Sequence, residues 1–190
     1  MGEIQKIFYY HVSSAISIYL GVLISFIFSF LSIIKKSSVY DFIAWSGIEV
    51  STLWSALVII TGMLWAKEVW GVYWVWDPRL TSVSILFSLF ILYLIFRSSF
   101  RSSPLNTILI LFISINAVFV HIAVKVWRGM HPTVIYKRGG LVKEMLLPFF
   151  LSLFSFFLLT IILIWLRTKI KCLGERIRKI EVERLIEDDR

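Results

Sequence analysis

The sequence predicts an all-α integral membrane protein, a bundle of about five transmembrane helices. Of its 190 residues, 58% are hydrophobic, and the mean hydropathy of +0.84 is more apolar than one soluble core of this size can bury. The apolar runs are continuous and close to the twenty residues that a spanning helix needs, whereas barrel strands are alternating segments of about ten residues. The expected spans lie at about 12–34, 42–64, 78–96, 105–124 and 146–166.

The basic residues predict how the chain is oriented. Two connectors on one side carry Lys35, Lys36, Arg97 and Arg101, and the basic tail from Arg167 reaches the same side. By the positive-inside rule this side is cytoplasmic, with the protein as a multi-pass component of the inner (cytoplasmic) cell membrane. The N-terminus and the segment between spans two and three then lie outside the cytoplasm.

Residues 1–166 are expected to form the transmembrane domain, and 167–190 a cytoplasmic tail. Apolar residues recur in this tail at helical spacing, which predicts either an amphipathic helix on the membrane or a partner, or a solvated charged helix. These residues are Ile170, Leu173, Ile177, Ile180, Leu185 and Ile186.

Composition excludes several classes of function. The net charge of +8 is spread over both membrane faces without a nucleic-acid motif, so we expect lipid contact and no nucleic acid. Cys172 is the single cysteine, so the chain can form no internal disulfide and no CxxCH haem-attachment site. The first apolar run is too long for a cleavable signal peptide. Because there is no GxxxxGK[ST] loop and no nucleophile with a base, we expect neither an ATPase nor a hydrolase.

The most informative segment is WAKEVWGVYWVWDPR, from Trp65 to Arg79. A solvated connector gains nothing from indoles that it cannot bury, so lipid headgroups, another protein or a flat hydrophobic ligand must cover them. A helical conformation would put Trp70 and Trp74 on one face, and an extended one would add Trp76 to the row. Asp77 followed by proline predicts the start of span three, with the aspartate as N-cap. Gly71 permits a turn or a close backbone approach.

Three histidines are expected at the same membrane face as these tryptophans. They are His11, His121 and His131, and that face also holds five of the eight tryptophans, Trp65, Trp70, Trp74, Trp76 and Trp127. A porphyrin needs an aromatic or apolar surface, imidazoles for its iron, and basic groups such as Arg79 or Arg128 for its propionates. The face therefore predicts a haem site, although an interfacial histidine can also simply reach toward headgroups.

Polar residues inside the spans have both functional and structural explanations. Glu49 is the only acid expected within the hydrocarbon. Such a side chain pairs with a partner inside the bundle, stays protonated, or reaches toward the membrane interface. Asn116 is expected to hydrogen-bond across helices. Trp45 is expected to anchor the cytoplasmic side as part of an aromatic belt.

The string WGVYWVWDPRLTS resembles the tryptophan-rich WGxxWxWD (WWD) signature of haem-handling proteins in cytochrome c maturation. The preceding TGMLWAKEV, the start YYHVSSA and the segment HIAVKVWRGMHP are similar to the haem exporter protein C (CcmC) family. The resemblance runs from His11 to about His131. It implies transient binding of haem b and its delivery to the haem chaperone CcmE. It also implies as partners the ATP-binding cassette pair CcmA and CcmB and a small CcmD-like subunit.

Carried over residue by residue, the resemblance makes His11 and His131 the axial ligands of the haem iron. The signature positions Trp70, Gly71, Trp74, Trp76 and Asp77 would form the haem platform and contact the chaperone. Asn116, His121 and Trp127 also match family positions, with hydrogen bonding ahead of ligation for His121. The chain departs from the family by starting ten residues before the first histidine, where the family usually has a helix. It also has Lys125 and Val126 where the family has an acid and a tryptophan.

Other functions remain open at this point. The same histidines could hold a permanent haem in an electron carrier, which would keep haem without a chaperone and cycle with quinol. A haem-lyase sibling of the same superfamily would be much longer. A transporter with an interfacial tryptophan belt would keep its haem content when Trp74 and Trp76 are both changed to Phe.

Overall fold

A computed structural model describes residues 4–100, 104–126, 131 and 141–188. Five helices account for nearly all of them: α1 (Gln5–Lys35), α2 (Ser38–Trp70), α3 (Pro78–Ser99), α4 (Pro104–Val126) and α5 (Lys143–Asp188). Each is long and apolar enough to cross a membrane, and the described residues contain no strand. This confirms the predicted all-α integral membrane protein.

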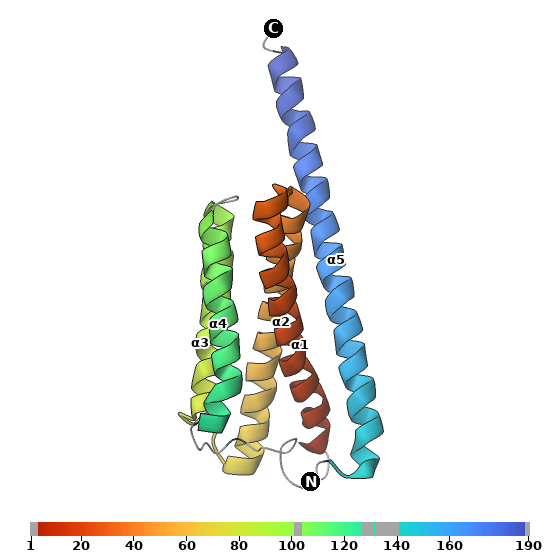
Figure 1. Cartoon of the computed structure of the whole chain (residues 1–190). Coiled ribbons are helices and arrows are strands. Elements are labelled where there is room, and N and C mark those ends of the chain that lie inside the picture. Colours follow the sequence, from red (N-terminus) through yellow and green to blue (C-terminus); the bar gives the residue numbers. More distant parts are fainter. Residues whose placement is uncertain (1–3, 101–103, 127–130, 132–140, 189–190) are drawn as a thin grey trace.

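The helices form three neighbouring groups. α1 and α2 form the central antiparallel pair, α3 and α4 pack together on one side, and α5 lies against α1 and α2 on the other (Figure 1). α1 ends at Lys35 and α2 begins at Ser38, and so short a connection makes consecutive helices antiparallel neighbours.

The α1–α2 pair is close because small residues line the crossing. A Cβ atom on Gly47 would lie 2.8 Å from the carbonyl oxygen of Gly21, so a side chain at position 47 would force the two helices apart. Ser51 of α2 donates a hydrogen bond to the carbonyl of Ile18 in α1 at 3.3 Å. Small residues permit this backbone approach, which drives helix association where lipid supplies no hydrophobic force.

Helix α5 joins the expected fifth span and the expected helical tail. The predicted boundary between span five and the tail at 166/167 lies inside one continuous helix of 46 residues, which projects well beyond the other helices (Figure 1). The apolar residues of the tail, such as Ile177 and Leu185, are exposed. Helical hydrogen bonds continue through the change in composition because Arg167–Lys171 contains no residue that breaks a helix.

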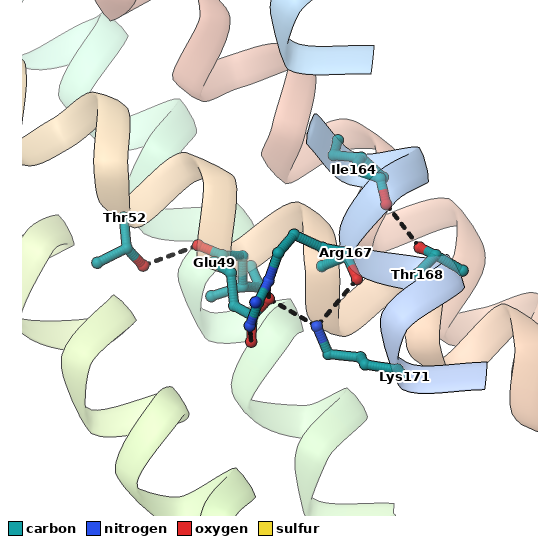
Figure 2. Close-up of polar contacts among 8 residues, drawn as sticks. Glu49, Thr52, Ile164, Arg167, Thr168 and Lys171 are labelled. Carbon is teal, nitrogen blue, oxygen red and sulfur yellow. Dashed lines mark hydrogen bonds and ion pairs between the residues drawn. The ribbon is translucent and has the colours of Figure 1, made fainter. Parts of the chain in front are cut away.

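At one end of the bundle, here called the ion-pair end, charged residues join three helices. Asp41 of α2 pairs with Arg97 of α3, whose side chain is 1% exposed. Glu49 of α2 accepts hydrogen bonds from Arg167 at 2.8 and 3.1 Å and from Lys171 at 2.6 Å, both on α5 (Figure 2). Glu49 therefore has the partners that an acid in a membrane requires, and they come from the region predicted to be a separate tail.

Trp45 lies within this charged group rather than only against headgroups. The Nζ atom of Lys171 is 4.4 Å from the centre of its indole ring, and the guanidinium carbon of Arg97 is 4.9 Å away. Cation–π attraction of this kind strengthens when the groups are removed from water. The expected belt anchor therefore also joins α2 to α3 and α5.

Candidate functional site

His11 lies at the opposite end of the bundle, here called the histidine end, and its ring is fixed by α2. Its Nδ1 atom is 3.0 Å from the hydroxyl oxygen of Thr61, and that hydroxyl donates to the carbonyl of Leu57 at 2.6 Å. Because the threonine hydrogen is already used, its oxygen accepts and His11 donates from Nδ1. The lone pair of His11 therefore lies on Nε2, the arrangement that second-shell hydrogen bonds impose on metal-binding histidines.

Gly62 leaves room for this ring. A Cβ atom at position 62 would lie 3.2 Å from Cε1 of His11, closer than most side-chain contacts. The sequence interpretation gave no role to Thr61 or Gly62, although both belong to the TGMLWAKEV string that resembles the haem-handling proteins. Thr61 and Gly62 lie four and three residues before Trp65. On a helix this spacing puts them on the same face as Trp65, which could have indicated their place near the site.

His131 is the second histidine at this end. Its ring centre is 6.3 Å from that of His11, with 29° between the ring planes. The Nη1 atom of Arg79 is 2.9 Å from Nδ1 of His131. Since a guanidinium only donates, His131 accepts at Nδ1. The Nδ1 atom therefore donates a hydrogen bond in His11 and accepts one in His131.

The distance between the ring centres of this stacked pair is close to that of two imidazoles that share one iron. Two imidazoles that share a metal ion, each with a metal–nitrogen bond of about 2 Å, have ring centres about 6 Å apart. The structure brings together His11 and His131, 120 residues apart in sequence, at 6.3 Å. Haem would here be cargo, and the donor set is one that haem iron accepts.

The tryptophan segment adopts neither of the two conformations considered from sequence. α2 ends at Trp70, where Gly71 has φ +77° and its N–H donates to the carbonyl of Lys67 at 3.0 Å. Glycine adopts this left-handed conformation without the steric cost of a Cβ atom, so the chain leaves the helix here. Trp65 and Trp70 therefore lie on α2, and Trp74 and Trp76 lie in the connector that follows it.

The four indoles form two edge-to-face pairs instead. Trp65 and Trp70 have ring centres 5.3 Å apart on the last turns of α2, and Trp74 and Trp76 are 5.9 Å apart in the connector. This is a favourable geometry for aromatic pairs. Trp76 is nonetheless 82% exposed, so its ring is available to a ligand, a protein or lipid.

Asp77 is the N-cap of α3, as predicted from sequence. Its Oδ1 accepts the backbone N–H of Arg79 at 2.8 Å, Pro78 occupies the first helical turn, and the carboxylate is buried. The cap fixes the first turn of α3 and therefore fixes Arg79, whose side chain reaches His131. The predicted N-cap role of Asp77 is confirmed, and its contact with haem or a chaperone stays a prediction.

The remaining predicted site residues are not gathered at the histidine pair. His121 is exposed and meets the ring edge of Tyr19 at 6.3 Å, and Tyr19 lies eight residues or about 12 Å along α1 from His11. Asn116 does not make the expected hydrogen bond with its side-chain oxygen, which is buried without a partner among the described residues. Trp127 and Arg128 lie outside the described residues.

Comparison with known proteins identifies the family. Residues 1–183 match the family model of CcmC, heme exporter protein C. The chain belongs to the haem exporter protein C family. The resemblance carried by the tryptophan signature is thereby confirmed, and with it a role in haem handling for cytochrome c biogenesis.

Individual members agree with this assignment. A ccmC-like mitochondrial cytochrome c biosynthesis protein of Marchantia polymorpha is 34% identical over 173 residues, covering 88% of this chain and 74% of that protein. Heme exporter protein C of Bradyrhizobium diazoefficiens is 29% identical, covering 95% and 72%. Heme exporter protein C of Escherichia coli K12 is 26% identical, covering 88% and 70%.

Proposed function

We propose that this member of the haem exporter protein C family binds haem b transiently between His11 and His131 and delivers it to a CcmE-type haem chaperone. The observation that carries the proposal is the separation of 6.3 Å between two imidazoles beside a tryptophan-rich connector. Imidazoles supply axial ligands to haem iron, and indoles supply an apolar surface for its ring.

The two histidines would play unequal parts. Thr61 already holds His11 with its Nε2 lone pair available, so His11 is the first ligand. His131 accepts from Arg79 at Nδ1, whereas a neutral imidazole that binds iron through Nε2 carries its proton on Nδ1. Arg79 must therefore turn away before His131 ligates in this form. A haem propionate is the natural acceptor for the released guanidinium.

This asymmetry suits a protein that passes its cargo on. The second ligand would form only while Arg79 is held by a propionate, so withdrawal of that propionate would return Arg79 to His131 and weaken the iron bond. Binding that is moderate and reversible serves delivery better than permanent ligation. The exposed ring of Trp76 and the neighbouring Trp74 would form the surface where haem and chaperone meet.

We place the histidine end outside the cytoplasm and the end of α5 in the cytoplasm, in the inner membrane. The chain would act without enzymatic activity of its own, as a haem-transfer component. An ATP-binding cassette pair of the CcmA and CcmB type would supply energy, together with a small CcmD-like subunit. Gly71, Trp65, Trp127 and Arg128 would complete the haem surface, with His121 and Asn116 in supporting roles.

The test is the haem-to-protein ratio and absorption spectrum of the detergent-purified chain, expressed with and without a CcmE-type chaperone. We expect haem to accumulate in a complex with the chaperone, and His11→Ala and His131→Ala each to change the ligation spectrum. The loss of bound haem should be greater for His11→Ala, because Thr61 prepares that ring alone.

The outcome also separates delivery from the electron-carrier alternative. A carrier would retain stoichiometric haem whether or not the chaperone is present, and its spectrum would cycle reversibly with quinol. The delivery proposal for this site fails if the haem-to-protein ratio is the same with and without the chaperone. It also fails if neither histidine substitution changes the haem content or the spectrum.

A further inference from the structure

A groove of about 740 Å³ lies on the lipid-facing side of the ion-pair end, where α1, the start of α2 and α5 meet. Its walls are mainly aliphatic, from Ile24, Ile43, Ile161 and Ile164, with the indole of Trp165 on α5. Further along α5 the groove is lined by Thr168, Lys169, Cys172, Leu173 and Arg176. One end is therefore apolar and the other basic.

Three cations of α5 outside the groove have carboxylate partners, whereas the two groove cations have none among the described residues. Arg167 and Lys171 pair with Glu49, and Arg178 pairs with Glu175. Lys169 and Arg176, which line the groove, make no ion pair among the described residues, and no carboxylate lines the groove within that part of the chain. The groove thus presents two positive charges without a protein counter-charge.

The length of the groove along α5 matches one leaflet of a membrane. From Ile161 to Lys169 is eight residues, or about 12 Å of helix, and from Lys169 to Arg176 is about 10 Å more. Half of the hydrocarbon core is about 15 Å thick, and the headgroup layer adds about 5 to 8 Å on each side. An acyl chain would therefore lie along the stretch from Ile161 to Lys169, and its headgroup along the stretch from Lys169 to Arg176.

We propose that this groove is a binding site for an anionic phospholipid, with an acyl chain against the aliphatic walls and the phosphate between Lys169 and Arg176. Anionic headgroups are attracted by basic residues next to a membrane span. Haem is a poorer occupant, because the described lining offers one aromatic ring and no histidine. This site is independent of the histidine end and does not rest on the proposed haem delivery.

Cys172 provides the test, because it is the only cysteine of the chain and it lies in the groove, partly buried. The full chain is placed in nanodiscs of phosphatidylcholine alone or with phosphatidylglycerol, and the rate of reaction with uncharged N-ethylmaleimide is measured. We expect phosphatidylglycerol to slow the reaction about tenfold, since two basic residues favour an anionic headgroup. Lys169→Ala combined with Arg176→Ala should abolish the slowing.

Matched variants exclude an effect of surface charge alone. Lys179→Ala with Arg184→Ala removes the same charge from α5 outside the groove and should leave the slowing intact. Lys169→Arg with Arg176→Lys keeps the charge and should also preserve it. In a Cys172→Ser chain, Gly174→Cys introduces a thiol at the same depth, where the surrounding space is open, and phosphatidylglycerol should slow it far less.

Three results would overturn the proposal. Equal slowing at positions 172 and 174 would indicate a general membrane effect rather than a site. Slowing that survives the double alanine substitution in the groove would remove the assigned headgroup contacts. Protection of Cys172 by haem added to phosphatidylcholine nanodiscs, lost in that double variant, would assign the groove to haem instead.

Discussion

The two ends of the bundle use polar side chains in opposite ways. At the ion-pair end, the carboxylates of Asp41 and Glu49 are paired with cations from α3 and α5. At the histidine end, His11 is hydrogen-bonded at one nitrogen by Thr61 and keeps the other for a ligand, and Trp76 is largely exposed. One end holds the helices together, and the other leaves groups able to bind.

The difference follows from what each end must do in lipid. A charge within or next to hydrocarbon is costly, so it persists where a partner neutralises it. A ligand site must instead keep some donor atoms that are not bonded to other groups of the folded protein. The comparison therefore predicts that substitutions at the ion-pair end change stability, whereas those at the histidine end change haem binding.

The largest effect on stability is expected for Asp41→Asn. It leaves the guanidinium of Arg97, 1% exposed, without its carboxylate, and breaking a buried pair costs about 3 kcal/mol. Reversible unfolding in mixed detergent micelles measures this cost. Haem content per folded molecule should not change.

A matched control is Glu175→Gln in the exposed pair with Arg178, which should change the unfolding free energy by about 0.5 kcal/mol or less. If Asp41→Asn lowers haem content without lowering stability, the two ends are not separate in function.

The next largest effect is expected for Thr61→Val, which has nearly the same shape but cannot accept from Nδ1 of His11. Loss of a second-shell partner typically lowers affinity about 10- to 100-fold. Haem titration followed by absorbance measures the change, and unfolding should be little affected.

Thr61→Ser keeps the hydroxyl and should retain affinity within about threefold, because its oxygen still accepts from His11. Equal loss in the valine and serine variants would mean that Thr61 acts through packing rather than by holding the histidine tautomer.

The smallest effect is expected for Gly62→Ala. The added Cβ atom would lie 3.2 Å from Cε1 of His11, so the ring must move by a few tenths of an ångström. A side chain pushed from its preferred rotamer costs about 1 kcal/mol, or about fivefold in affinity.

Gly174→Ala, where nothing lies within 4 Å of the added atom, serves as the control and should leave haem affinity unchanged. A Gly62→Ala chain with unaltered haem affinity and spectrum would show that the ring position does not limit ligation.

Sequence patterns were sufficient for much of this organisation. Continuous apolar runs predicted the spanning helices, and Asp77 followed by proline predicted the start of α3, because both signals are local in the chain. The tryptophan signature predicted the family. Helices were predicted on both sides of position 166, and α5 joins them without a break because no residue between 167 and 171 ends a helix.

The sequence by itself determined that this protein spans a membrane, where its helices lie and which aromatic and histidine residues distinguish one end. The tertiary structure decided which residues meet: Thr61 with His11, Arg79 with His131, and Glu49 with Arg167 and Lys171. Hydropathy and capping depend on neighbouring residues and can be evaluated from the chain. Contacts across 50 to 122 residues depend on how each helix is rotated and how close the backbones come, which the crossing of Gly21 and Gly47 sets for α1 and α2.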